Sequence, residues 1–144
     1  MALVKTSDFV GAAFFKPADH MLALALLIEP KSIQRDVPNT YMNVTRNRDE
    51  VVADVTVFSN TDSLREGVPS EVILSAKFVH GMLTDTLSKI MGEATIATIV
   101  KIPTKGGSGF VFRDASDEAT AAVTKYYEGR EAAFAAALDD VPDF

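Results

Sequence analysis

The sequence predicts a mainly β protein of five strands, with one helix between the third and fourth strands and another helix at the C-terminal end. Two periodicities support this prediction. Several segments alternate apolar and polar residues, as half-buried strands do. Two other segments repeat apolar residues at every third or fourth position, as helices with one buried face do. The length of 144 residues suits one folded domain.

The first half of the chain is predicted to supply two strands. After an irregular start over residues 1–17, leucines alternate with alanines over 20–29 and predict the first strand. Pro30 is expected to end this strand. The next segment, 31–47, contains a proline and several asparagines and is expected to form a loop. Valines then alternate with other residues over 50–58, which predicts the second strand.

The middle of the chain is predicted to form a strand, a helix and another strand. Residues 59–69 are expected to form a turn region with space for a short helical turn. The segment 71–78 is rich in valine, isoleucine and phenylalanine and predicts the third strand. The spacing of apolar residues becomes helical over 79–91. The segment 94–102 is rich in β-branched residues and predicts the fourth strand.

The last part of the chain is predicted to form a hairpin and a helix. The glycine-rich segment 105–109 is expected to turn the chain into a fifth strand that begins at 110–113. A helix is predicted over 116–138, because Ser116 or Asp114 can cap it and acidic residues follow in its first turn. The chain is therefore divided into a β domain, a helix and an acidic tail, at 1–114, 115–138 and 139–144.

The composition excludes several kinds of site. The absence of cysteine excludes disulfides, thiolate zinc sites and cysteine nucleophiles. His20 and His80 have no neighbouring ligand pair, so we expect no metal and no cofactor. The glycine-rich turn lacks the Gly-Lys-Ser/Thr order of a phosphate-binding loop, and we expect a protein that is not an enzyme. No signal-peptide pattern is present and the apolar run 21–28 is short, so a cytoplasmic protein outside the membrane is expected.

The net charge of −6 is concentrated at one end of the chain. Residues 1–113 contain 12 basic and 12 acidic residues, whereas 114–144 contain 2 basic and 8 acidic residues. The segment 101–113 has three cations and no acid. A neutral body with a local basic hairpin and an anionic end is compatible with nucleic-acid binding, although the total charge is negative.

The predicted hairpin combines cations and aromatic rings. Proteins hold single strands with a basic groove that follows the phosphates and with rings on which bases stack. Phe110 and Phe112 share one face of their strand, because strand side chains alternate. They form a stacking surface if that face points outward and belong to the core if it points inward. The candidate DNA-binding residues of this hairpin are Lys101, Lys105, Phe110, Phe112 and Arg113.

A second basic group lies in the expected loop at 31–47 and just after it. It holds four cations and a tyrosine, and an ordinary solvated loop is the alternative interpretation. One further aromatic residue and one lysine on predicted strands are also candidates. These additional DNA-binding candidates are Lys31, Arg35, Tyr41, Arg46, Arg48, Phe58 and Lys77.

The last six residues form an acidic tip that ends on an aromatic ring. Such a peptide can dock on a protein partner, because the ring fills a pocket while basic groups hold the carboxylates. A frayed acidic end is the alternative. The candidate partner-binding residues are Asp139, Asp140, Val141, Pro142, Asp143 and Phe144.

The tip resembles the acidic C-terminal tip of bacterial single-stranded DNA-binding proteins, which typically ends Asp-Asp-Ile/Leu-Pro-Phe. This chain departs from that pattern because Asp143 stands between Pro142 and Phe144. The predicted order of elements is similar to that of an oligonucleotide-binding (OB) barrel, with a helix between strands three and four. A five-stranded sheet with helices on one face shares much of this pattern. Together these features resemble the single-stranded DNA-binding proteins of bacteriophages over about residues 20–144.

The resemblance implies a protein of the host-cell cytoplasm that coats single-stranded DNA without sequence preference during phage replication, recombination or repair. It also implies that the acidic tail engages replication or recombination proteins. The oligomeric state stays open, with a homodimer as one form. The first alternative is a structural or assembly protein, such as a virion component, that oligomerises through its C-terminal helix. The second is a magnesium-dependent nuclease that uses Asp49, Glu50 or Asp54.

Overall fold

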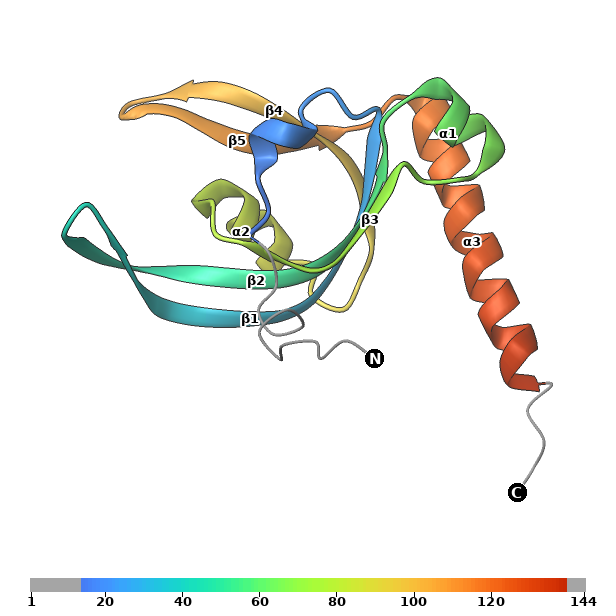
Figure 1. The fold of residues 1–144 in the computed structure, drawn as a ribbon, viewed down its shortest axis with the longest axis horizontal. Coiled ribbons are helices and arrows are strands. Elements are labelled where there is room, and N and C mark those ends of the chain that lie inside the picture. The colour runs from blue at the N-terminus through green and yellow to red at the C-terminus, as the bar shows by residue number, and fades with distance from the viewer. Residues whose placement is uncertain (1–13, 140–144) are drawn as a thin grey trace, which may run out of the picture.

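The computed structural model describes residues 14–139, which form a curled antiparallel sheet with helices at its inner face and at one end (Figure 1). The predicted fold class is confirmed: this part of the chain is mainly β, with one helix between the third and fourth strands and another at the C-terminal end. A short 3-10 turn precedes the first strand. The elements are Pro17–His20 (3-10), β1 Ala25–Tyr41, β2 Val44–Phe58, α1 Thr61–Glu66, β3 Glu71–Phe78, α2 Gly81–Ser88, β4 Thr95–Thr104, β5 Gly107–Asp114 and α3 Asp117–Asp139.

The strand order in the sheet is β3-β2-β1-β4-β5, and all neighbouring strands are antiparallel. Because β1 lies between β2 and β4, the order agrees with that of an OB barrel. Within the described residues β3 and β5 do not pair with one another, so the sheet forms a half-barrel. Helix α2 contacts both β2 and β5 and lies between the two hairpins of the sheet (Figure 1).

The predicted loop at 31–47 is wrong, because β1 and β2 form one long hairpin through most of that segment. Pro30 does not end β1 and pairs with Ala53 inside the strand. The carbonyl of Pro30 points toward β4 and accepts a hydrogen bond from Gly92 N at 3.2 Å. The nitrogen of Pro30 points the same way, and β1 pairs with β4 only over Leu26–Ile28. The missing N–H therefore removes no ladder hydrogen bond.

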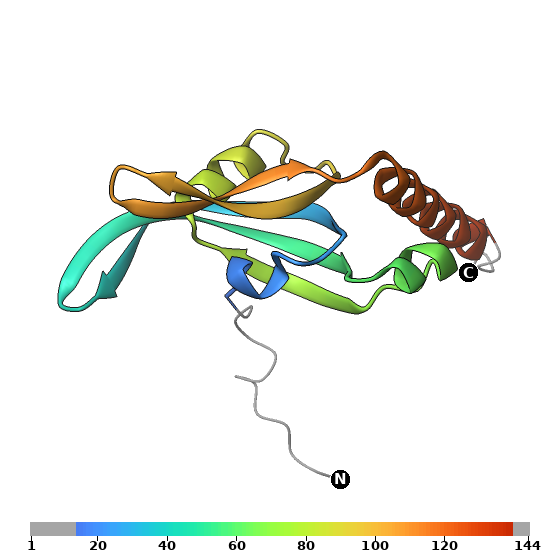
Figure 2. The ribbon, with the colours of Figure 1, turned by 90° about the horizontal axis from the view of Figure 1, so that it is seen from above.

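Two hairpins extend beyond the body of the sheet in the same direction (Figures 1 and 2). We call residues 33–50 of β1 and β2 the first arm, and residues 100–111 of β4 and β5 the second arm. The first arm turns through Met42 and Asn43, and the hydroxyl groups of Thr40 and Thr45 are hydrogen-bonded across it at 2.8 Å. The two arms border the inner side of the half-barrel.

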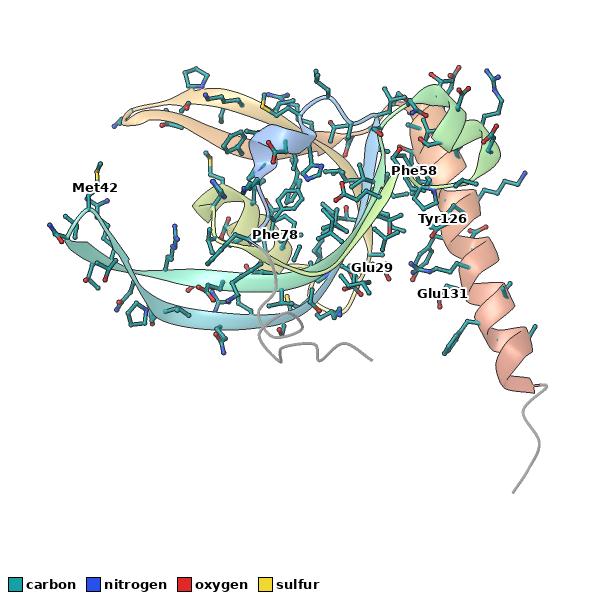
Figure 3. The ribbon with its side chains drawn as sticks, viewed as in Figure 1. Glu29, Met42, Phe58, Phe78, Tyr126 and Glu131 are labelled. Atoms are coloured by element: carbon teal, nitrogen blue, oxygen red, sulfur yellow. The ribbon has the colours of Figure 1, made fainter. Side chains whose placement is uncertain are left out.

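Two clusters of buried side chains hold the fold together. The larger cluster fills the curl of the sheet and is closed by α2, with Phe78, Leu83 and Leu87 among its fully buried members. The smaller cluster lies between the outer face of the sheet and α3, where Phe58 meets Tyr126 edge to face (Figure 3). Removing these large apolar surfaces from water is the main stabilising term.

An ion pair also fixes α3 against the sheet. The guanidinium of Arg130 donates two hydrogen bonds, at 2.9 and 2.8 Å, to the carboxylate of Glu29 on β1. The same guanidinium lies 5.2 Å from the centre of the Tyr127 ring. Hydrogen bonding to Glu29 raises the pKa of Arg130, against the opposing effect of burial. This bidentate contact sets the point at which α3 leaves the body of the protein.

Candidate nucleic-acid interface

An open groove lies between the two arms. It consists of two adjoining cavities of about 600 and about 470 Å³, which share His80 and Phe110 in their walls. Thr40 and Arg48 of the first arm line the larger cavity, and Thr104 of the second arm lines the smaller one. The start of α2 lies between them. We call this space the inter-arm groove.

Arg48 brings a positive charge to the groove from β2. Its Nε atom is buried and has no hydrogen-bond partner among residues 14–139. A buried N–H without a partner is costly. Arg48 also lines the groove and forms no ion pair with another described residue, so its guanidinium charge is available there for an anion.

His80 stands at the junction of the two cavities, immediately before α2. Burial, and secondly the charge of Arg48, lower the pKa of His80 below its ordinary value of 6.5. The side chain forms no capping hydrogen bond to α2 and meets the Phe110 ring edge to face, with 5.4 Å between the ring centres. An anion beside His80 and Arg48 would oppose the second of these causes, because it would offset the charge of Arg48.

Phe110 and Phe112 share the inner face of β5. In the register of the second arm they lie opposite Lys101 and Ile99, and Ile99 is buried in the core. Both rings are half-buried and pack against the larger cluster, so they do not form an outward stacking surface. Phe110 nevertheless lines both cavities of the groove. It is the ring of the predicted hairpin that a bound base could reach.

The three cations of the β4–β5 hairpin point in different directions. Lys101 lies opposite Phe110 and therefore on the groove face, whereas Lys105 lies at the tip of the arm. Arg113 follows Phe112 in the strand and points to the opposite face. None of these cations forms an ion pair with another described residue.

The cations of the β1–β2 hairpin divide into paired and unpaired groups. Lys31 pairs with Asp54 at 2.9 Å, and Arg35 pairs with Asp49 at the same distance. Arg46 is exposed and forms no ion pair within the described part of the chain. Arg46 and Arg48 are therefore the cations of this group whose charge is available for a ligand. The side chain of Tyr41 lies outside the described part.

Two predicted DNA-binding residues have other roles. Phe58 is 1% exposed and packs on Tyr126 at 5.3 Å between ring centres, so its prediction as a base-stacking residue is wrong. It points to the outer face because Phe58 alternates with Val57, which faces the curl of the sheet. Lys77 is engaged by Glu50 at 3.7 Å and lies 5.3 Å from the Phe14 ring centre.

Some groove residues were not among the predicted site residues. Phe14, Phe15 and Lys16 line the larger cavity because Phe15 N donates a hydrogen bond to Lys77 O at 2.8 Å, which fixes this segment at the edge of β3. The only signal in the sequence is the adjacent pair of phenylalanines, which is equally typical of a core. His80 has no sequence signal beyond its position at the start of a helix.

The carboxylates of the nuclease alternative do not assemble into a metal site. Asp49 and Asp54 pair with Arg35 and Lys31, and Glu50 is buried beside Lys77. In residues 14–139 no three metal-ligating side chains are grouped so that they could hold an ion. The predicted tail at 139–144 lies outside the described residues, apart from the backbone of Asp139 at the end of α3.

No protein family, curated protein or solved structure matches this chain. Among the described helices, none has the length and apolar character needed to cross a membrane.

Proposed function

We propose that the protein binds single-stranded DNA without sequence preference and protects it during phage DNA replication, recombination or repair. One observation carries this proposal: the inter-arm groove brings Arg48, His80 and Phe110 together between two arms. In OB folds, nucleic acid binds on the sheet between the loop of strands one and two and the loop of strands four and five. The two arms occupy these two positions in the strand order.

The proposed mechanism separates the contacts to phosphates from the contacts to bases. Arg48 lines the groove, Lys101 lies opposite Phe110 in the β4–β5 hairpin, and Arg46 and Lys105 extend the positive charge along the arms. These cations attract the phosphates and replace their counterions. A base stacks on the accessible part of Phe110, which tolerates any sequence because every base has a π face. Binding needs no catalytic group.

Titration of labelled oligo-dT with the full chain at several salt concentrations tests the proposal. We expect the logarithm of the binding constant to fall as the logarithm of salt concentration rises, by about 0.7 for each phosphate contact. Replacing the exposed Lys105 by Ala should reduce this slope by about 0.7 and leave the melting temperature unchanged. Lys31→Ala is the matched control, because Lys31 is already paired with Asp54. Binding that ignores salt, or no binding at low salt, contradicts the proposal.

The acidic tail is proposed to dock replication or recombination proteins. Asp139, Asp140 and Asp143 supply charge for a basic surface, and Phe144 supplies an apolar anchor. This proposal concerns residues beyond the described part of α3 and rests on the composition of the tip.

A structural or assembly role is a second candidate, favoured by the end of α3. Residues 131–136 are all exposed, and Phe134 keeps 63% of its surface in water. An exposed ring on a helix that extends beyond the body suits contact with another chain. A stable oligomer that does not change the electrophoretic mobility of oligo-dT would favour this candidate over DNA binding.

A further inference from the structure

The turn of the first arm carries a residue that the fold does not favour there. Met42 and Asn43 both have positive φ values, 50° and 63°. Two-residue turns of this kind strongly prefer Asn-Gly or related pairs, because other side chains are strained at positive φ. Met42 is also 80% exposed, so its apolar side chain gains nothing from burial. Neither local conformation nor packing explains a methionine at this position.

The surroundings of Met42 narrow the kind of partner that it could meet. Figure 3 shows Met42 at the tip of the arm. Val44, two residues further along the chain, is also exposed, so the tip presents two apolar side chains. The strand segments behind the tip contain Arg46 and Arg48, and no acid occurs between Asp36 and Asp49. An apolar tip on a cationic ribbon is complementary to a polyanion with apolar surfaces. Single-stranded nucleic acid has this combination, with charged phosphates and uncharged base faces.

The position of the tip is also suitable for a strand that leaves the groove. The first arm is long, and both Arg48 and Thr40, which lies close to the turn, line the groove. The hydrogen bond between Thr40 and Thr45 joins the two strands close to the turn, so that the tip is presented on a paired ribbon. The arm extends to the same side as the second arm (Figures 1 and 2).

We propose that Met42, assisted by Val44, is an apolar wedge that inserts between neighbouring bases of single-stranded DNA bound in the inter-arm groove. This inference rests on the proposed function and adds to it the separation of two stacked bases at the arm tip. Insertion of apolar side chains between base steps is an established way for proteins to unstack nucleic acid. Arg46, on the strand that leaves the turn, would hold the phosphate next to the opened step.

Met42→Asn in the full-length protein separates the role of the side chain from that of the turn. Asparagine accepts positive φ more readily than methionine, so the melting temperature should stay equal or rise. An oligonucleotide that carries 2-aminopurine becomes more fluorescent when the probe is unstacked. We expect the native protein to raise this fluorescence, and Met42→Asn to lose most of that rise and to bind about fivefold or more weakly. Met42→Leu, which keeps an apolar side chain, should behave like the native protein.

The possible outcomes distinguish the wedge from the groove proposal. If the native protein binds oligo-dT with the expected salt dependence but Met42→Asn changes neither the fluorescence nor the affinity, the wedge is wrong and the groove proposal stands. Weaker binding of Met42→Asn with an unchanged fluorescence rise also overturns insertion, because the tip would then only touch the strand. If the native protein does not bind at low salt, both proposals fail together.

Discussion

The side chain of Phe110 contacts both the buried core and the groove. Part of its ring packs against the larger cluster beside Phe112, while another part lines the inter-arm groove and meets His80. Any substitution of this residue changes packing as well as binding, so a variant has to preserve the apolar volume. Leucine does this approximately and lacks the π face on which a base stacks.

Phe110→Leu is therefore expected to weaken oligo-dT binding about fivefold or more, because stacking on an aromatic ring contributes about 1–3 kcal/mol per base. The free energy of unfolding should fall by only about 1.5 kcal/mol or less. Fluorescence anisotropy measures the first quantity, and urea unfolding the second. Phe112→Leu is the matched control, since Phe112 shares the strand face of Phe110 but lines neither cavity. Equal affinity losses in both variants would count against base stacking on Phe110.

At the scale of the elements, α3 is held to the sheet by the smaller buried cluster, which includes Phe58, and by one ion pair. Phe58 of β2 is buried against Tyr126, and Glu29 of β1 holds Arg130 at the next turn of the helix. The part of α3 beyond Glu131 extends from the body without burial of its side chains over residues 132–136. The attachment of the helix therefore rests on its first half.

Phe58→Ala should lower the free energy of unfolding by about 3–5 kcal/mol, because it leaves a cavity between the sheet and α3. Chemical denaturation followed by circular dichroism measures this loss. Phe134→Ala makes the same chemical change at a ring that is 63% exposed, and we expect it to leave the stability almost unaltered. If Phe58→Ala instead kept the native stability and weakened DNA binding, Phe58 would belong to the DNA-binding surface and not to the contact between the sheet and α3.

At the scale of the whole molecule, the charges are separated along the chain. The two arms carry the unpaired cations Arg46, Lys101 and Lys105, whereas the excess of acid begins at residue 114. A negative tail on the same chain competes with DNA phosphates for the cationic arms, or it repels the phosphates directly. It should therefore lower the apparent affinity for DNA.

Deletion of residues 139–144 is expected to leave the affinity for oligo-dT equal or to raise it, and to abolish the contact with a replication partner. The increase should be greatest at low salt, where electrostatic effects are least screened. A variant in which Asp139, Asp140 and Asp143 are all replaced by Asn is the control, because it removes the charge and keeps the length. Weaker DNA binding by the shortened protein would show that the tail contributes to the DNA site.

Local composition and spacing were sufficient for two elements, although β3 itself contains a register shift between Ile73 and Ala76, with Ser75 at φ 55°. The third strand was predicted at 71–78 and is β3 Glu71–Phe78, and the C-terminal helix was predicted at 116–138 and is α3 Asp117–Asp139. The first arm was not predicted, because register shifts after Pro30 and Gln34 interrupt its alternation. Asp36, at φ 55°, lies within the second of these irregularities. These interruptions, together with the proline and the asparagines of the segment, obscure the period-two pattern.

The fold class, the separation of acid from base and the shared face of Phe110 and Phe112 are contained in the order of residues, because periodicity and charge are local properties. The order of residues does not determine whether that face points inward, because alternation assigns residues to a common face without placing the face relative to the core. The meeting of Arg48, His80 and Phe110 depends on the curl of the sheet around α2, and the burial of Phe58 depends on where α3 docks. These are contacts between distant segments, and they arise only when the strands pair and the helices pack.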